Sequence, residues 1–298
     1  MSTVNTASEA KQAKKRVKQN SQAYDIWRRL KKNRMAIVGM IILIILICTM
    51  IFADQIVPYR AATKQNMAIK MQGPSLEHIM GTDSFGRDVF ARVVHGSRIS
   101  LSIGFIAVTL SLLAGGVIGA IAGFYGGKTD IILMRFMDMF MALPSILLAI
   151  CIVSVLGPGM TNLLLAVSLS GIPRFAVIVR SSVLTVKNSE FVEAARAAGA
   201  GTARIILKHI LPNAMGPIIV QATLSMGGVI LTASSLSFIG LGVQPPTPEW
   251  GSILTEGKEF IRQSPHLVMF PGLAIMISVL ALNFLGDGLR DALDPRLK

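Results

Sequence analysis

The chain has 298 residues, of which 52% are hydrophobic and only 15% charged, and its mean hydropathy is +0.60. This composition excludes an ordinary soluble domain and indicates a membrane protein. The formal net charge of +13 does not indicate a nucleic-acid-binding protein, because only 6% of the residues are aromatic and many basic residues gather before the first apolar segment. The two cysteines, Cys48 and Cys151, each lie within an apolar segment, so we expect no disulfide framework and no cysteine metal cluster.

The chain begins with a basic tail, residues 1–34, that contains ten Lys and Arg residues. Such a tail is typical of a cytoplasmic segment held against anionic membrane lipid. The first apolar segment, residues 35–53, is nineteen residues long, and no small-residue cleavage site follows it. We therefore predict a first transmembrane helix rather than a cleaved signal peptide.

Five further apolar segments are long enough to span a membrane, and they lie at residues 99–126, 139–156, 160–179, 215–242 and 267–285. Segments 139–156 and 160–179, the third and fourth of the six, would be continuous without Gly157, Pro158 and Gly159, which predict a tight turn between them. The sequence thus predicts an all-α membrane protein with six transmembrane helices.

Six spans place both termini on the same side of the membrane. Lys and Arg are concentrated in the segments on that side, which predicts that both termini are cytoplasmic. Residues 54–98 are then an extracytoplasmic segment, residues 99–290 a five-helix core that contains the cytoplasmic loop 181–212, and residues 291–298 a cytoplasmic C-terminal tail.

Two glycine-rich stretches have structural interpretations. Gly115, Gly119 and Gly123 recur every four residues, which favours close packing of another helix on that face. The next stretch, AGFYGGKTD (residues 122–130), ends like a phosphate-binding loop, but its first glycine is one position out of place and an apolar span precedes it. We therefore expect a glycine turn at a helix end, and neither ATP nor another cofactor bound by this chain.

Ionisable residues inside a span are costly and have a partner or a watery path. Arg174 follows Pro173 in the fourth span, so it either faces a translocation path where the helix is locally broken or extends to the cytoplasmic surface, and the sequence is compatible with both. Arg135 and Asp138 are three residues apart, and we expect them to pair with each other.

The extracytoplasmic segments predict neither a catalytic nor a metal site. In GTDSFGRD, Thr82 or Asp83 is expected to cap a turn, and Arg87 and Asp88 to pair locally. Trp250 follows the stiff PPTP stretch and is expected to anchor at the membrane interface. No ligand spacing relates the four histidines, which are His78, His95, His209 and His266.

The loop between the fourth and fifth spans is polar but regular in pattern. Residues 190–198 and 203–210 favour two short helices around a turn at Gly199 and Gly201, and Leu211 and Pro212 are expected to break the second helix. Such a helix with a small-residue face suits a groove on a partner protein, although an ordinary connecting loop would have the same composition.

The sequence of this loop resembles the EAA motif of permease subunits of ABC importers. The matching residues are Glu193, Ala194 and Ala195, then Gly199, then Leu211 and Pro212, and the departure is His209, where the family has a hydrophobic residue. In that family the helix inserts into a cleft of the cytoplasmic ATPase. The resemblance implies that the residues coupling this chain to an ATPase are Glu193, Ala194, Ala195, Arg196, Ala197 and Gly199.

Three other stretches, residues 78–101, 236–254 and 283–298, resemble the second permease subunit of dipeptide and oligopeptide importers. Ala233 departs from the pattern, since many relatives have an acidic residue near it. The resemblance implies a type I ABC importer permease in a bacterial or archaeal inner membrane, and no enzyme activity in this chain. The implied partners are a homologous second permease in a heterodimer, two ABC ATPases that bind ATP and Mg, and an extracytoplasmic substrate-binding protein.

Three alternatives follow from the same residues. Permeases for nickel or other small solutes share much of this pattern. An ion-coupled secondary transporter would need titratable groups in mid-membrane and usually internal repeats, whereas Arg174 is the one such residue near mid-span. A membrane enzyme would need a nucleophile, metal or acid–base constellation, and the sequence offers none that spacing makes specific.

Overall fold

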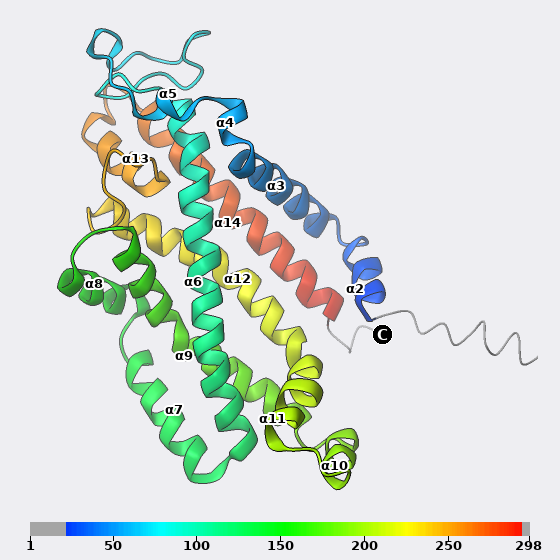
Figure 1. Ribbon diagram of the computed structural model, residues 1–298. Helices are drawn as coiled ribbons and strands as arrows, with labels where there is room; N and C mark the ends of the chain where they lie inside the picture. Colours follow the sequence, from blue (N-terminus) through cyan, green and yellow to red (C-terminus); the bar gives the residue numbers. More distant parts are fainter. Residues whose placement is uncertain (1–21, 294–298) are drawn as a thin grey trace, which may run out of the picture.

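The computed structural model describes residues 22–293, and the predictions for residues 1–21 and 294–298 lie outside this range. The described chain is helical, with one isolated bridge between Thr82 and Asp88. Five of its helices are long and apolar enough to cross a membrane. They are α3 (Arg34–Ile51), α6 (Val89–Tyr125), α9 (Met160–Val186), α12 (Leu211–Phe238) and α14 (His266–Leu293), and among them α6 runs nearly the whole length of the molecule (Figure 1).

The third predicted span is not one straight helix, although the two helices at its place together are apolar enough to be a sixth span. Its place is taken by α7 (Gly127–Met141) and α8 (Ser145–Leu156), which are bent by 82° at the break between them. Pro144 lies at the break with ψ 132°, and proline also disfavours helical geometry in the residue before it. The twelve residues of α8 extend only ~18 Å, which is shorter than the hydrocarbon core.

Both predicted glycine turns are confirmed. Gly157 and Gly159 have φ values of 87° and 141° and separate α8 from α9. Gly126 and Gly127, with φ values of 67° and 54°, join α6 to α7 within the stretch that ends like a phosphate-binding loop.

The helices α6 and α9 pack closely through the predicted glycine face. A Cβ added to Gly115 would lie 2.5 Å from the carbonyl oxygen of Ile172, and one on Gly119 would lie 2.3 Å from that of Ala176. Only glycine allows the two backbones this approach. The packing role predicted for these glycines is therefore confirmed.

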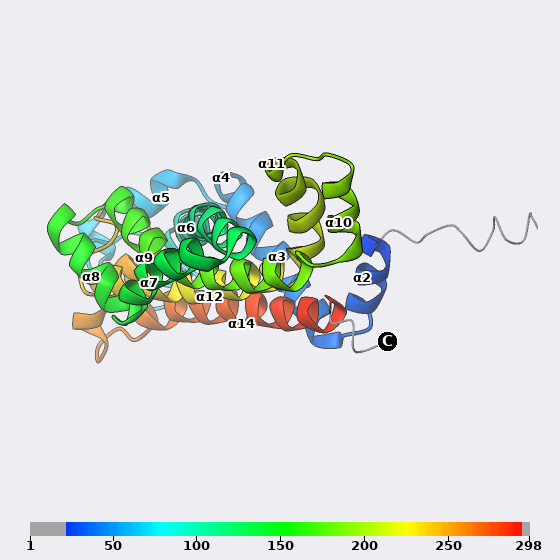
Figure 2. The ribbon, with the colours of Figure 1, turned by 90° about the horizontal axis from the view of Figure 1, so that it is seen from below.

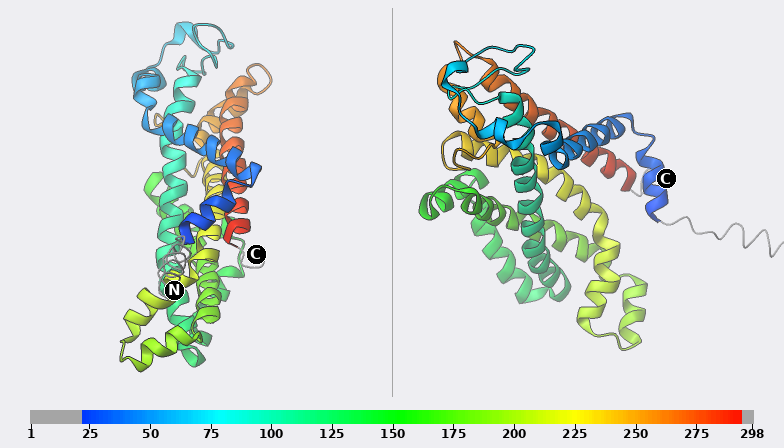
Figure 3. Two further views of the ribbon diagram at one scale, coloured as in Figure 1. Left: turned by 90° about the vertical axis from the view of Figure 1, so that its right-hand side faces the viewer. Right: turned by 45° about the horizontal axis from the view of Figure 1, so that its top comes forward.

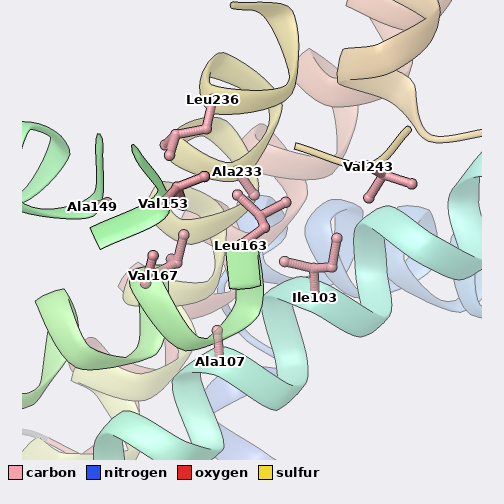
Figure 4. Close-up of a cluster of buried hydrophobic side chains, with 10 residues drawn as sticks. Ile103, Ala107, Ala149, Val153, Leu163, Val167, Ala233, Leu236 and Val243 are labelled. Atoms are coloured by element: carbon pink, nitrogen blue, oxygen red, sulfur yellow. The ribbon is translucent and has the colours of Figure 1, made fainter. Parts of the chain in front are cut away.

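A buried apolar cluster ties α8 to the long helices. It contains side chains from α6, α8, α9 and α12, among them Ile103, Val153, Leu163 and Leu236 (Figure 4). Because α8 cannot span by itself, this cluster fixes its position against α9 and α12.

The first long helix packs at the outside of the bundle. The short α2 (Gln22–Leu30) and α3 lie along α14, which can be followed from below in Figure 2 and from two further directions in Figure 3. Asn33 caps α3 by accepting from the amides of Met35 and Ala36, and its Nδ2 donates to Asp291 Oδ2 at 3.0 Å. The α2–α3 corner is thus fixed to the last turn of α14.

Short helices gather at one end of the molecule, here named the α13 end. They are α4 (Ala53–Ile56), α5 (Tyr59–Thr63), η1 (Met67–Ile69), α13 (Trp250–Gly257) and η3 (Lys258–Phe260). The opposite end, named the α10 end, carries α10 (Glu190–Ala197) and α11 (Thr202–Arg204) (Figure 1).

A buried cluster of charges holds the α13 end together. Asp83 Oδ2 accepts from Arg87 Nε and from Arg92 Nη1, both at 2.6 Å. Glu256 accepts from Arg92 Nη1 at 2.6 Å and also pairs with Arg87. These four side chains connect the segment before α6 to α13.

The turn role predicted for Asp83 is confirmed, since its Oδ1 accepts from the amides of Phe85 and Arg87 at 2.9 Å. The predicted pairing of Arg87 with Asp88 is wrong. Asp88 instead caps α6 and lies 2.8 Å from His78 Nδ1, because its place at the start of a helix turns it away from Arg87.

Trp250 is a core residue, so its predicted place at the membrane interface is wrong. Its side chain is 1% exposed, packs on Gly96 and donates from Nε1 to the carbonyl oxygen of Val93 at 2.9 Å. The adjacent Glu249 caps α13, and burial raises the pKa of its carboxyl even though Gly251 and Ser252 amides donate to it.

Candidate functional site: the α10 loop and the Arg174 cavity

The α10 loop, residues 187–204, leaves the last turn of α9. At its start Lys187 Nζ donates to the carbonyl oxygens of Gly123 and Phe124 at 3.1 and 3.3 Å, which caps the end of α6. Glu190 and Glu193 lie in the first turn of α10 and Arg196 in its last. This distribution of charge complements the helix dipole.

The predicted turn at Gly199 is confirmed in detail. Gly199 has a φ of 80°, its amide donates to Arg196, and the amide of Ala200 donates to Ala195 at 3.1 Å. These two bonds form the Schellman motif that ends helices at a left-handed residue. A Cβ on Gly199 would meet no atom within 4 Å, so backbone angle rather than space requires glycine here.

One buried side chain holds α10 to the rest of the molecule. Val192 is completely buried in an apolar cluster with residues of α9, η2 and α12, including Val183, Ile205 and Ala214. The opposite face carries the small residues of the predicted coupling set. Of that set, Glu193, Ala194, Arg196, Ala197 and Gly199 are exposed and Ala195 is half-buried.

The predicted helix break at Leu211 and Pro212 is wrong. From Thr202 to Phe238 the chain is one helix, which contains the π-helical turn η2 (Ile205–Ile210). The amide of Leu211 donates five residues back, to the carbonyl oxygen of Ile206, as in a π-helix. With this wider turn before it, the helix continues through Pro212, which has no amide proton to donate. The loop is therefore joined directly to α12.

The second feature is a cavity of about 530 Å³ between α6, the α7–α8 break, α9 and α12. Arg174 lines it, together with Gln221, Ser170, Ser225 and Thr232. One of the two interpretations of Arg174 included a local helix break at Pro173, and this break is absent, since α9 is helical through this position. Arg174 lines the cavity because it lies on the side of α9 that faces the cavity.

The two features share α9. Val183, in the cluster that holds α10, follows Arg174 by nine residues, or ~13 Å along the helix. α12 also contributes residues to both the cluster and the cavity, so two packed helices connect the cluster beside α10 to the cavity walls.

The ion pair near this end of α9 differs from the predicted one. Arg180 binds Asp130 of α7 with two hydrogen bonds, one of them 2.6 Å from Nη2 to Oδ2. Arg135 and Asp138 form no ion pair with each other. Asp130 and Arg180 are far apart in the sequence, but Asp130 lies near the start of α7 and Arg180 toward the end of α9, and these two ends adjoin. The spacing of charges along one helix cannot predict such a pair, whereas the order of the spans could have indicated it.

Comparison with known proteins identifies the family of the chain. The family of binding-protein-dependent transport system inner membrane components matches residues 115–298. The chain belongs to this family. A second family, the N-terminal TM domain of oligopeptide transport permease C, matches residues 21–74.

Curated relatives are similar over almost their whole length. The chain is 49% identical to the dipeptide transport system permease protein DppC of Alkalihalophilus pseudofirmus, over 92% of this chain and 90% of that protein. It is 42% identical to the di/tripeptide transport system permease protein DppC of Pseudomonas aeruginosa, over 92% of each. The glutathione transport system permease protein GsiD of Escherichia coli is 46% identical over 92% of this chain and 91% of its own.

Solved structures support the fold. The MetNI methionine ABC transporter in an inward-facing conformation matches with a TM-score of 0.56 and 18% identity, over 68% of this chain and 96% of its own. An amino acid ABC transporter matches with a TM-score of 0.53 and 16% identity, over 67% and 94%. The predicted importer-permease fold is confirmed, and the chain is an integral inner-membrane transport component.

Proposed function

We propose that this chain is the second permease subunit of an ATP-driven importer of dipeptides or oligopeptides. The observation that carries the proposal is its similarity, over about nine tenths of both chains, to permeases named for dipeptide and di/tripeptide transport. The match of residues 21–74 to the N-terminal domain of oligopeptide transport permease C adds independent support.

The proposed assembly contains this chain, a homologous second permease, two ATPases that bind ATP and Mg, and an extracytoplasmic substrate-binding protein. The α10 end faces the cytoplasm and the α13 end faces outward, with both termini inside. The concentration of Lys and Arg in the inner segments supports this orientation.

In the proposed mechanism, the exposed face of α10 from Glu193 to Gly199 docks in a groove of an ATPase. Closure of the ATPases on ATP displaces α10, and the cluster around Val192 transmits the displacement to α9 and α12. The path then faces outward, and it faces inward again after hydrolysis. Such alternating access requires that α10 makes different contacts with the ATPase in the two states.

The experiment that tests this function is affinity purification of the full chain from native membranes, with mass spectrometry of the co-purified proteins. We expect a second permease and P-loop ATPases, and an ATP hydrolysis rate that falls in Glu193→Ala. The control is Glu259→Ala, which removes another exposed carboxylate, at the α13 end, and should leave hydrolysis unchanged. Recovery of this chain alone, with transport driven by an ion gradient, would instead indicate a secondary transporter.

A further inference from the structure

The Arg174 cavity has the composition of a site for an anion. Arg174 is the one charged residue among the described residues that line it, and no Asp or Glu faces it. The remaining polar lining comes from Gln221 and from hydroxyl groups, and its volume of about 530 Å³ is in the range of small-molecule sites.

Arg174 has no hydrogen-bond or ion-pair partner within residues 22–293, although its side chain is exposed to the cavity. It is residue fifteen of the 27 in α9, so the helix continues for ~18 Å beyond it to Val186. The next arginine on this helix, Arg180, is already paired with Asp130. An unpaired guanidinium in the middle of a span requires water or an anionic partner.

The neutral polar groups of the cavity leave the guanidinium as its strongest donor. Ser170 and Thr232 donate their hydroxyl protons to carbonyl oxygens of their own helices, and Gln221 Nε2 donates to Ser225 Oγ at 2.8 Å. The other walls include the apolar side chains of Phe140, Leu143, Leu224 and Val229. A ligand with one carboxylate and variable apolar groups matches this lining.

We propose that Arg174 binds the C-terminal carboxylate of a peptide as it crosses the membrane, while the apolar walls accept side chains of different sizes. The planar guanidinium offers two parallel N–H donors to a carboxylate, a geometry that lysine does not have. This inference rests on the proposed peptide import and adds the group of the substrate that the permease itself recognises.

The first test compares ATP-driven transport of dialanine and dialanine amide by the reconstituted complex, with saturating loaded binding protein. The measured quantity is the transport rate of dialanine divided by that of dialanine amide. Because Arg174→Gln removes a charged hydrogen bond to the carboxylate, it lowers this ratio by about tenfold or more, and Arg174→Lys restores part of it. The control is Arg135→Gln, an exposed arginine outside the cavity, which keeps the wild-type ratio. An unchanged ratio in Arg174→Gln overturns the inference.

A second test reports on the cavity without transport. Gly228 lines the cavity, and a Cβ there meets no atom within 4 Å, so Gly228→Cys introduces a thiol without a clash. In a background with Cys48→Ser and Cys151→Ser, this thiol is treated with an anionic and with a cationic methanethiosulfonate. A nearby positive charge favours the anionic reagent, and Arg174→Gln lowers the ratio of the two rates by about threefold or more.

Dialanine should protect the Gly228→Cys thiol from both reagents, and dialanine amide should not.

The results distinguish failure of the proposed function from failure of the proposed carboxylate site. If the wild-type complex moves no peptide, the proposed function fails, whatever the thiol shows. If the wild-type complex moves dialanine but neither ratio depends on Arg174, peptide import stands and the carboxylate site is refuted.

Discussion

The conformation of Gly199 gives the sharpest test of the α10 loop. At a φ of 80° an alanine costs about 1–2 kcal/mol of strain, which the lower entropy of the unfolded loop offsets by about 0.4–1 kcal/mol. Since no atom lies within 4 Å of a Cβ here, no clash adds to the cost. The net loss of local stability in Gly199→Ala is about 1 kcal/mol, or about fivefold more opening of the loop.

The assay is amide hydrogen exchange of residues 190–204 in the purified complex without nucleotide. Gly201 is the matched control, because its φ is −68° and a Cβ there also meets nothing within 4 Å. Gly201→Ala gains stability because alanine lowers the entropy of the unfolded loop, and it loses stability because alanine is a poorer helix N-cap than glycine. These two contributions nearly cancel, so we expect little change in exchange in this variant. Equal exchange in the two variants would refute the argument that backbone angle is what requires glycine at 199.

Three further predictions concern the bundle and the α13 end. Gly119→Ala should lower the melting temperature of the purified protein, because overpacking costs about 1–3 kcal/mol, whereas Gly116→Ala, with no atom near the added Cβ, should not. Glu256→Ala should destabilise the α13 end by about 3–5 kcal/mol, because Asp83 alone must then balance the charges of two buried arginines, Arg87 and Arg92, and a melting temperature equal to that of Glu259→Ala would contradict this. Because burial raises the pKa of Glu249 above 4.5 in the folded state, the unfolded state binds fewer protons just above that pH, so stability should fall as pH rises through this window. Glu249→Gln should flatten this part of the stability profile measured by thermal unfolding.

Most of the fold was predictable because long apolar segments and glycine spacing are properties of the local sequence. The face formed by Gly115, Gly119 and Gly123 and the turn at Gly157 are both of this kind. The bend in the third span was not predictable in this way. Its hydrophobicity is continuous through 139–156, but Pro144 changes the direction of the backbone, which a hydrophobicity pattern does not record.

In the α10 loop, the short helix and the turn at Gly199 were predictable because both depend on a few neighbouring residues. The packing that holds this helix against the bundle was not predictable, because Val192 is buried in a cluster whose other members come from distant parts of the sequence. Pro212 predicted a break, but a π-helical turn absorbs the missing hydrogen bond. Which side of α9 Arg174 occupies depends on how that helix packs, so the sequence left both of its interpretations open.

The most direct test of the central claim, that α10 couples ATP hydrolysis by partner subunits to peptide uptake, is transport into proteoliposomes. The complex is reconstituted with its binding protein, and ATP-dependent uptake of labelled dialanine is measured beside uptake of nickel. We predict uptake of dialanine but not of nickel, and its loss in Gly199→Pro, which can neither adopt a positive φ nor donate to Arg196. Nickel uptake without dialanine uptake, or normal dialanine uptake by an inserted and assembled Gly199→Pro complex, would contradict the account.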